Sequence, residues 1–435
     1  MKRRTTMASI GLVAALASSL VLAFPARAQT QAQTLAQTPA QAPATAVDLP
    51  STEQALAAID QDPAVMQALR ALQVATHASA MRAAGPYEWT VGATGQRRRI
   101  EGIGSSNEWS AQIERPIRIG GKAALDRDIG QAGLRQAQAE LAAARQLAAR
   151  ALADHWLDWL AARQSRTRLQ EQVATAEANL RAVETRRKAG DASLLEISVA
   201  QADVSEAKRQ ASLAAAAQAR AQAALRVRYP QLPLPLVAPA LSEPLALERT
   251  EDQWRERILA VSGKVLAAQA ALRKAEAMAA RARAERTPDP TLGVFTAQEA
   301  FRSERVLGLT LSIPLGGTYR TQAALEAQQQ AEVARAAVDR ESREVEVEVA
   351  TQVVEAASSL ERWRLAEQAT AAASDAARLT QRAYTLGEAD LQTLLLVRRQ
   401  WLDAINAAAT ARADALRARY RLLIDARLLW ETRAE

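Results

Sequence analysis

The side chains that most often carry catalysis or bind metals are scarce in this chain. It has no cysteine and only two histidines, His77 and His155, which are far apart in the sequence. Asp154, His155 and Asp158 have a spacing that could begin a metal site, but nothing in the sequence completes the ligand set. Because His155 adjoins Trp156, we expect it to be a packed or rim residue. The sequence therefore predicts no metal centre, no cofactor and no enzymatic activity.

Two patterns that could bind phosphate or nucleic acid lack the context they need. Gly102-Ile103-Gly104 is not placed between a strand and a helix, as a phosphate-binding loop requires. Arg97, Arg98 and Arg99 form a basic cluster, but no aromatic residues are interleaved with it. We expect this cluster to lie in a polar external loop near anionic lipid headgroups. Nucleic acid is therefore not expected as a partner.

The N-terminus has the three parts of a secretory signal. Lys2-Arg3-Arg4 is basic, residues 10–24 are apolar, and Ala26-Arg27-Ala28 matches a cleavage site. We interpret residues 1–28 as a signal peptide that directs the chain to the bacterial envelope; the apolar stretch is short for an uncleaved membrane anchor. Removing it takes away four basic residues and no acid, so the net charge falls from +7 to +3 (7 − 4). Residues 29–49, rich in Gln, Ala, Thr and Pro, are expected to be a flexible spacer.

A long stretch without proline follows further along the chain. Residues 120–188 comprise 69 residues of helix-forming composition, which as one helix would extend about 100 Å. Apolar residues recur in this stretch with the spacing of a coiled-coil seam. They are Leu152, Trp159, Leu169, Val173, Ala176, Leu180 and Val183. The pattern predicts a long helix that packs lengthwise against other helices.

The chain contains an internal duplication. Pro116 and Pro314 each come just before a Gly-Gly pair and a long helical stretch, and they are 198 residues apart (314 − 116). Gly190 and Gly387 mark turns at the far ends of these stretches and are 197 residues apart (387 − 190). Two landmarks that repeat with nearly the same offset indicate two structural repeats.

Each repeat is predicted to contain a helix, a pair of strands, a long helix, a turn and a second helix. The first repeat covers residues 50–228 and the second covers residues 250–430. A connector with five prolines, residues 229–249, joins them, and residues 431–435 form a tail.

One possible helix break and one strand-like stretch lie within the predicted helices. The first helix is expected to be interrupted near Asp62-Pro63, whereas the helix that opens the second repeat is expected to run from about 250 to 286. Residues 344–349 alternate Glu and Val like a strand. We predict a helix there, because their counterpart 197 residues earlier lies within the first long helix.

Short stretches with a period of two precede each long helix. They lie near 87–94 and 107–114 in the first repeat and near 292–296 and 306–313 in the second. They predict four strands, each with an apolar and a polar face and a length that suits an outer membrane. The residues expected to face lipid are Trp89, Trp109, Leu309 and Leu311, and those expected to face a lumen are Glu108, Gln112 and Thr310. Soluble hairpins packed on a core are the alternative, but no other sheet is predicted nearby.

Four strands cannot close into a barrel, and an open sheet edge in lipid leaves backbone groups without partners. The chain must therefore form oligomers. Two copies would supply eight strands and a barrel filled by its own side chains, whereas three would supply twelve and leave a lumen. The lumen favours a homotrimer whose fold is mostly α-helical, with long antiparallel helical hairpins and a transmembrane β-barrel portion built from four strands per chain.

These elements and their order resemble the TolC-type outer-membrane efflux factors over residues 50–430. The resemblance is most specific at residues 113–122 and 313–317, which lead into the long helices, and at the turns 190–194 and 387–391.

Within that family, three short stretches resemble the CzcC-like branch, which works with heavy-metal pumps of the resistance–nodulation–division type. They are Tyr87-Glu88-Trp89, Asn107-Glu108-Trp109 and Glu114-Arg115-Pro116-Ile117. The resemblance implies heavy-metal cations as cargo. Drugs, organic solvents or an exported polypeptide are alternative cargoes.

The family resemblance implies a trimeric conduit with a barrel in the outer membrane and a helical barrel in the periplasm. A periplasmic adaptor, or membrane fusion protein, would join it to an inner-membrane efflux pump. The adaptor would dock at the helical turns, at Arg187, Gly190, Asp191, Leu194, Tyr384, Gly387, Glu388, Asp390 and Leu391. A non-channel periplasmic adaptor is the alternative from another class, but such a protein should have one helical hairpin rather than two.

Overall fold

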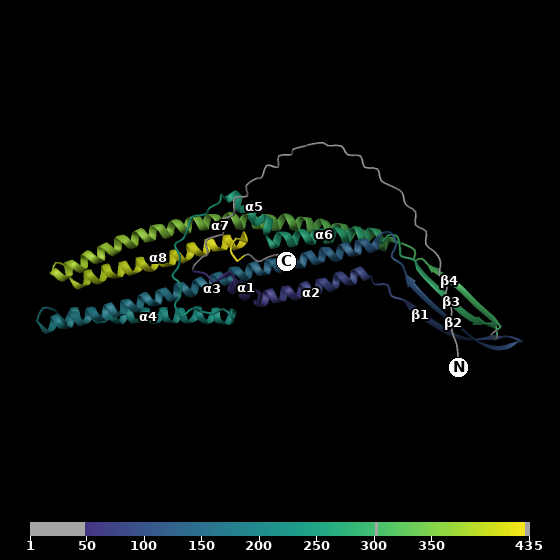
Figure 1. Ribbon diagram of the computed structural model, residues 1–435, viewed down its shortest axis with the longest axis horizontal. Coiled ribbons are helices and arrows are strands. Elements are labelled where there is room, and N and C mark those ends of the chain that lie inside the picture. Colours follow the sequence, from purple (N-terminus) through teal and green to yellow (C-terminus); the bar gives the residue numbers. More distant parts are fainter. Residues whose placement is uncertain (1–47, 301–302, 431–435) are drawn as a thin grey trace, which may run out of the picture. The chain divides into compact units, whose positions relative to one another are not determined.

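The computed structural model describes residues 48–300 and 303–430, which form eight helices and four strands (Figure 1). The predicted signal peptide at 1–28, residues 29–47 of the predicted spacer and the tail at 431–435 lie outside the described residues. In chain order the elements are α1 (Thr52–Asp60), α2 (Pro63–Ala84), β1 (Thr90–Ile100), β2 (Gly104–Pro116), α3 (Lys122–Lys188), α4 (Leu194–Arg228), α5 (Glu251–Val261), α6 (Gly263–Ala284), β3 (Thr291–Glu299), β4 (Glu304–Ser312), α7 (Thr318–Leu386) and α8 (Leu391–Asp425).

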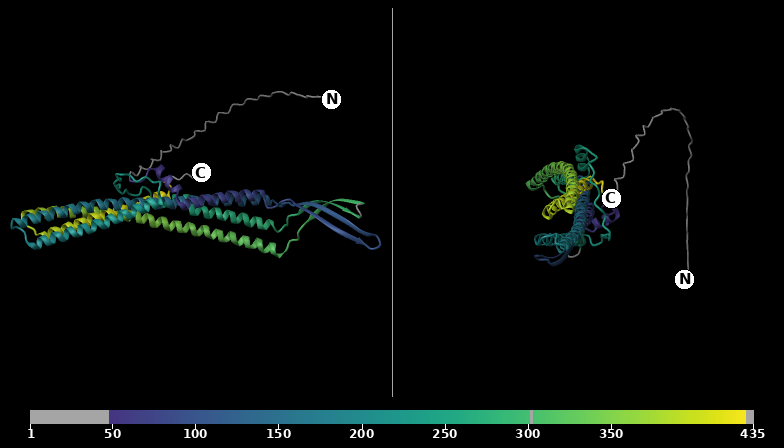
Figure 2. Two further views of the ribbon diagram at one scale, coloured as in Figure 1. Left: turned by 90° about the horizontal axis from the view of Figure 1, so that it is seen from below. Right: turned by 90° about the vertical axis from the view of Figure 1, so that its left-hand side faces the viewer.

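The two longest helices, α3 and α7, contain 67 and 69 residues. Helices α2 and α4 pack along α3, while α6 and α8 pack along α7, and α6 also contacts α3 (Figures 1 and 2). In the seam of α3, Leu152, Trp159 and Val183 are at most 1% exposed. The predicted long helix with lengthwise packing is confirmed. Within the described residues, no helix is both long and apolar enough to span a membrane.

Capping residues determine where the shorter helices begin. Asp62 caps α2 by accepting a hydrogen bond from the N–H of Ala64 (2.9 Å), and Pro63 occupies the first turn. The predicted interruption there is confirmed. The helix expected over 250–286 is instead divided at Ser262, which ends α5 with an extended backbone and caps α6. A serine hydroxyl that accepts from a backbone N–H competes with the helical hydrogen bonds, which explains this break.

Residues 344–349 are helical within α7, as predicted. Val345 and Val349 are four residues apart and therefore lie on one helix face. Both are buried in an apolar cluster with Trp254 and Ile258 of α5. Packing of this face outweighs the preference of valine for strands.

The largest apolar cluster joins α1, α3 and α8 to the connector between the repeats. Trp156 and Trp159 contribute the largest side chains, and Tyr229 of the connector is 2% exposed. The carboxylate of Asp48 is fully buried and accepts a hydrogen bond of 2.7 Å from the Tyr420 hydroxyl. The connector has neither helix nor strand, as predicted, but Asp48, at the end of the predicted flexible spacer, is firmly packed.

The four strands form one antiparallel sheet in the order β1-β2-β3-β4, so β1 and β4 are its edges. Strands β1 and β2 contain 11 and 13 residues and are longer than predicted. Arg97, Arg98 and Arg99, which were expected in a loop, belong to β1 and pair with residues 105–107 of β2. The apolar alternation ends before these arginines, but the backbone pairing continues to the turn.

The register assigns the strand residues to two faces. Residues directly opposite one another on neighbouring strands share a face. Trp109, Leu309 and Leu311 lie on the apolar face, which Trp89 continues just before β1. The opposite face is polar and carries Glu108, Gln112 and Thr310. On the apolar face Leu309 is 85% exposed, whereas Glu108 on the polar face is 4% exposed.

The close approach of α6 to α3 generates a stability prediction. A Cβ atom added to Gly263 would lie 2.6 Å from the backbone N of Ala143, too close for either helix to stay in place. We expect Gly263→Ala to destabilise the purified protein by about 1–3 kcal/mol, through overpacking. Thermal unfolding followed by far-UV circular dichroism measures this change.

Gly133→Ala is the matched control for this helix pair. A Cβ atom there would lie 3.8 Å from the Lys274 side chain, an ordinary contact. Alanine is also favoured over glycine by roughly 1 kcal/mol inside a helix, so this variant should unfold at the same or a higher temperature. Equal melting temperatures for Gly263→Ala and Gly133→Ala would contradict the proposed packing.

Candidate functional site

The described residues hold no group of three or more His, Asp or Glu side chains that could bind a metal ion. His155 packs edge-on against Tyr229, with ring centroids 6.4 Å apart. The arrangements of charged and polar side chains that stand out lie where the two repeats meet, at the helical turns, at mid-helix and beside the sheet.

The turn between α3 and α4 is tight and exposed. Gly190 has a φ of 89°, in the left-handed region that favours glycine. Its N–H donates to the carbonyl of Arg187 (3.0 Å), and the N–H of Asp191 donates to the carbonyl of Arg186 (2.8 Å). The side chains of Arg187 and Asp191 are exposed, and Leu194 is 68% exposed.

The turn between α7 and α8 has a related conformation. Gly387 has a φ of 78°, and the N–H of Glu388 donates to the carbonyl of Ala383 (2.8 Å). The Asp390 carboxylate caps α8 by accepting a hydrogen bond of 2.6 Å from the N–H of Thr393. This hydrogen bond holds the pKa of the Asp390 carboxyl below its ordinary value. Gly387, Glu388 and Asp390 are all exposed.

A small apolar cluster lies beneath the two turns and belongs to both repeats. Val183 and Ala192 come from the first repeat, and Leu391 and Leu394 come from the second. Leu391, which was expected to touch an adaptor, is only 3% exposed, because the two hairpins pack on each other there. Its place is therefore inside the tip, whereas Leu194 remains available at the surface.

One guanidinium connects the two turns. Arg186 donates to the Tyr384 hydroxyl (2.7 Å) and stacks over the same ring at 5.4 Å. It also donates to the carbonyl of Asp191 (2.9 Å). The sequence pointed to the neighbouring Arg187 and missed Arg186. A signal did exist, because Arg186 and Tyr384 are 198 residues apart, the same offset that separates the prolines of the two repeats.

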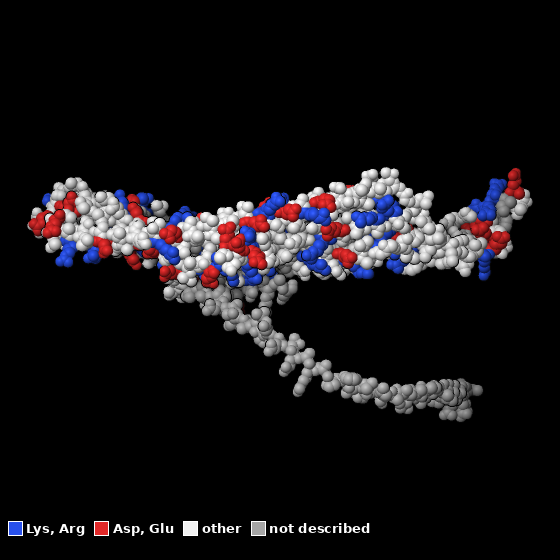
Figure 3. Space-filling view, turned by 90° about the horizontal axis from the view of Figure 1, so that it is seen from above, with Lys and Arg blue, Asp and Glu red and all other residues white. Residues whose placement is uncertain are grey.

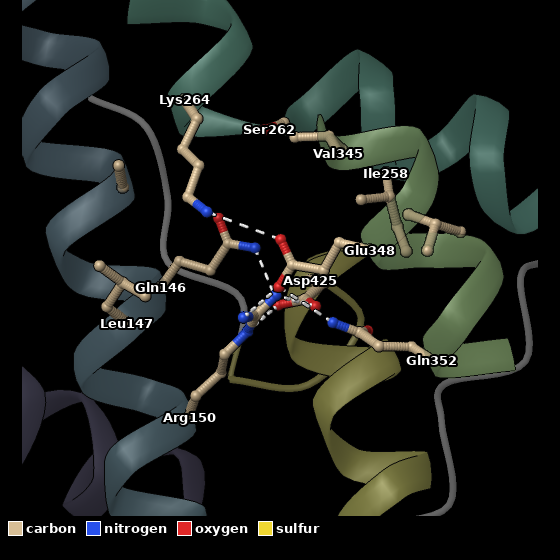
Figure 4. Close-up of a pocket in the computed structure, with 12 residues that line it drawn as sticks. Gln146, Leu147, Arg150, Ile258, Ser262, Lys264, Val345, Glu348, Gln352 and Asp425 are labelled. Atoms are coloured by element: carbon tan, nitrogen blue, oxygen red, sulfur yellow. Dashed lines mark hydrogen bonds and ion pairs between the residues drawn. The ribbon is translucent and has the colours of Figure 1, made fainter. Parts of the chain in front are cut away.

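A second link between the repeats lies near the middle of α3 and α7, and its side chains are drawn in Figure 4. Arg150 of α3 forms ion pairs with Glu348 of α7 (2.7 Å) and with the buried Asp425 of α8. Lys264 of α6 lies 3.6 Å from Glu348, and the Gln146 amide donates to Asp425 (2.9 Å). Burial acts to raise the pKa of Glu348, but Arg150 and Lys264 outweigh it and hold that pKa below its ordinary value.

These side chains line a cavity of about 30 Å³. Such a space holds a water molecule but no organic substrate. The cluster is therefore a structural connection between α3, α7 and α8 rather than a binding site.

A buried ion pair also joins the helices to the sheet. Lys122, at the start of α3, is completely buried and donates to Asp289 (2.7 Å) and to the carbonyl of Thr287 (2.7 Å). The Tyr87 hydroxyl donates to the other oxygen of Asp289 (2.7 Å). Burial and the neighbouring carboxylate raise the pKa of Tyr87 to about 12. Because Tyr87 comes just before β1 and Asp289 just before β3, this pair fixes how the strands leave the helices.

A family model described as outer membrane efflux protein matches residues 38–227 and 254–423 of this chain. The two matched segments cover most of the chain and correspond to the two repeats. A search of curated proteins found no match.

Several solved structures share the fold. A membrane protein from Pseudomonas aeruginosa has a TM-score of 0.72 and 17% identity, covering 88% of this chain and 91% of its own. The outer membrane protein VceC from Vibrio cholerae has a TM-score of 0.70 and 16% identity, covering 86% and 95%. The open state of the MtrE outer membrane channel from Neisseria gonorrhoeae has a TM-score of 0.64 and 19% identity, covering 86% and 88%.

The Arg186–Tyr384 contact predicts how firmly the two turns are held together. Losing one charge-assisted hydrogen bond at a partly exposed site costs about 1 kcal/mol. This cost corresponds to about a fivefold increase in the population in which the two turns are separated. We expect Arg186→Ala to broaden the distance between spin labels placed on the two turns. Tyr384→Phe keeps the ring under the guanidinium and should act more weakly. Because the chain has no cysteine, labels attach only at introduced cysteines.

Arg187→Ala is the control for this measurement. The Arg187 guanidinium donates to the carbonyl of Ala192 within its own turn (3.1 Å). An equal broadening in Arg187→Ala and Arg186→Ala would refute a specific link between the turns.

Proposed function

Because the chain belongs to the outer membrane efflux protein family, we propose that three copies form a conduit that exports heavy-metal cations. Membership of this family makes the chain a TolC-type efflux channel of the outer membrane, with a periplasmic helical extension, and not an enzyme. The trimer, the cargo and the docking residues are the parts that we propose.

The sheet supports the trimer. Its four strands contain 9 to 13 residues, close to the length needed to cross an outer membrane. Strands β1 and β4 are edges, which lipid cannot satisfy with hydrogen bonds. Pairing β4 of one copy with β1 of the next closes a ring of twelve strands around a lumen when three copies join.

The apolar face of the sheet supports its contact with lipid. Trp109 lies toward the end of the strands away from the helices, and Trp89 lies near the other end, beneath the Arg115 guanidinium at 5.5 Å. The six residue steps from Trp109 to Arg115 span roughly 20 Å along β2. Aromatic residues at both edges of an apolar band of this height are typical of outer-membrane strands. We therefore assign Trp89, Trp109, Leu309 and Leu311 to the lipid side.

The polar face then lines the lumen, and its charge favours cations. Glu108, Gln112 and Thr310 lie on it, as do all four strand glutamates but only one of the strand arginines. The glutamates are Glu108, Glu114, Glu299 and Glu304, and the arginine is Arg98. An acidic lining raises the local concentration of cations. This charge agrees with the resemblance of residues 87–89, 107–109 and 114–117 to the heavy-metal branch.

The helical turns supply the docking surface in this proposal. Arg187, Asp191, Leu194, Glu388 and Asp390 are exposed there and would contact a periplasmic adaptor that joins the channel to an inner-membrane pump. Gly190 and Gly387 set the turn conformations, while Tyr384 and Leu391 hold the two turns against each other.

The lipid assignment predicts unequal effects of two neighbouring substitutions. Leu309→Arg places a charge on the apolar face, at a cost of about 2–4 kcal/mol near the bilayer centre. Thr310→Arg places the same charge on the polar face. We expect Leu309→Arg to lower the yield of outer-membrane trimer far more than Thr310→Arg, measured by semi-native electrophoresis of membrane extracts. Equal yields would contradict the assignment of the two faces.

The docking assignment predicts a defect in export without a defect in assembly. Valine at position 387 would be forced toward a positive φ, at a cost of roughly 1–3 kcal/mol in the turn. The sheet lies at the other end of α7, so Gly387→Val should form normal trimers but export poorly and crosslink weakly to the adaptor from a photoreactive group at Leu194.

Tolerance assays on the same strains separate the cargoes. Gly387→Val should reduce tolerance to heavy-metal salts more than tolerance to drugs or solvents. Glu388→Lys, at an exposed site beside the glycine, is the milder control. Full export and undiminished crosslinking in Gly387→Val would rule out the docking assignment.

A further inference from the structure

We propose that Arg97, Arg99 and Arg305 bind the phosphate groups of the glycolipid headgroups in the outer leaflet of the outer membrane. This inference rests on the proposed function, since it requires the apolar face of the sheet to meet lipid. It adds a ligand and a set of residues to that face.

The strand register places these three arginines on the lipid side. Arg305 lies level with Trp109 across the sheet, since both are at the register position of Gln298 on β3. Trp109 marks the edge of the apolar band that is farther from the helices. On β1, Arg97 and Arg99 lie beyond this edge, opposite Asn107 and Ser105 of β2. The row order along this face is therefore apolar residues, then tryptophan, then arginines.

Arg98 alternates with its neighbours and faces the other way. Its guanidinium lies 3.2 Å from Glu108 and 3.9 Å from Glu299, so its charge is balanced on the polar face. Arg97 and Arg99 are exposed and have no ion pair with any described residue.

Arg305 is the third arginine on the lipid side whose positive charge is not balanced by an ion pair with a described residue. It is exposed and, among residues 48–300 and 303–430, no ion pair is formed with it. The strands place no acidic residue on the apolar face, because all four glutamates lie on the opposite face. In the view of Figure 3, charged side chains gather at the end of the sheet that lies away from the helices.

The chemistry of this surface fits an amphiphile rather than a free anion. Arginine binds phosphate oxygens through two parallel N–H···O hydrogen bonds, and it does so while its stem lies along apolar surface. The adjoining leucines and Trp109 offer a place for acyl chains. Because the helices are periplasmic, the arginines lie at the external ends of the strands, where the outer leaflet presents phosphorylated sugar headgroups.

In the proposed trimer the site is shared between two copies. Within one chain, Arg305 on β4 and Arg97 on β1 occupy opposite edges of the sheet. Pairing β4 with β1 of an adjacent copy would place Arg305 on the strand next to the arginines of that copy. Each seam between copies would then carry one cluster of three arginines.

The test uses the double variant Arg97→Gln/Arg99→Gln. Its control is Arg98→Gln, which also removes positive charge from the three consecutive arginines, but on the polar face. Each protein is purified as the trimer in neutral detergent, and its affinity for bisphosphorylated lipid A is measured by native mass spectrometry. An arginine near an anionic leaflet contributes about a fivefold affinity factor. The double variant should therefore bind about 25-fold more weakly, while Arg98→Gln should stay within about twofold of the wild type.

Further arms identify the chemical group that is bound. Arg97→Lys/Arg99→Lys keeps the positive charge but loses the paired N–H···O hydrogen bonds, so its affinity should lie between those of the wild type and the double glutamine variant. Dephosphorylated lipid A and phosphatidylglycerol should both bind much more weakly than lipid A to the wild-type trimer. Unchanged affinity in the double glutamine variant, an equal loss in Arg98→Gln, or equal binding of phosphatidylglycerol would overturn the proposal.

Size-exclusion chromatography of the same samples separates this proposal from the one on which it rests. A wild-type protein that forms no trimer in detergent would contradict the proposed function. A normal trimer whose affinity for lipid A is unchanged by Arg97→Gln/Arg99→Gln would contradict the binding site but not the proposed function.

Discussion

The unpaired edges of the four-stranded sheet are the constraint on which the rest of the structure depends. A membrane offers no hydrogen-bond partner to the backbone of β1 or β4, so each chain needs a neighbour on both sides. In the proposed trimer, the long helices that leave the sheet would run side by side around the same axis. The buried Lys122–Asp289 pair matters in this setting, because it sets the direction in which strands and helices meet.

The internal duplication provides the second level of organisation. Arg150 and Glu348 are 198 residues apart and in contact, and so are Arg186 and Tyr384. Residues at equivalent positions of the two repeats therefore face each other at mid-helix and again at the tip. Two identical arginines would repel each other there, whereas an arginine opposite a carboxylate or a phenol attracts. Different residues at equivalent positions of the two repeats therefore form contacts that hold the repeats together.

Periodicity in the sequence predicted most of the fold, and the reasons are physical. The two faces of the sheet followed from an alternation that includes Leu309, and residues 344–349 were correctly predicted as helix from their place in the repeat. The extension of β1 through Arg97, Arg98 and Arg99 was not predicted, because these residues and their partners at 105–107 are polar. Polar residues show no alternation of apolar and polar side chains that would indicate a strand. Arg186 and the buried Lys122 were missed because their partners lie far away in the sequence and only the folded chain reveals them.

Closure of the sheet by three copies can be tested directly with disulfides. The chain has no cysteine, so a cysteine at Thr94 on β1 can be paired with one at each position of β4 in turn without background reactions. We expect one register to yield, on denaturing gels of oxidised membranes, covalent species that end at three copies. Only monomers in every pairing, or a ladder that stops at two copies or continues beyond three, would contradict it.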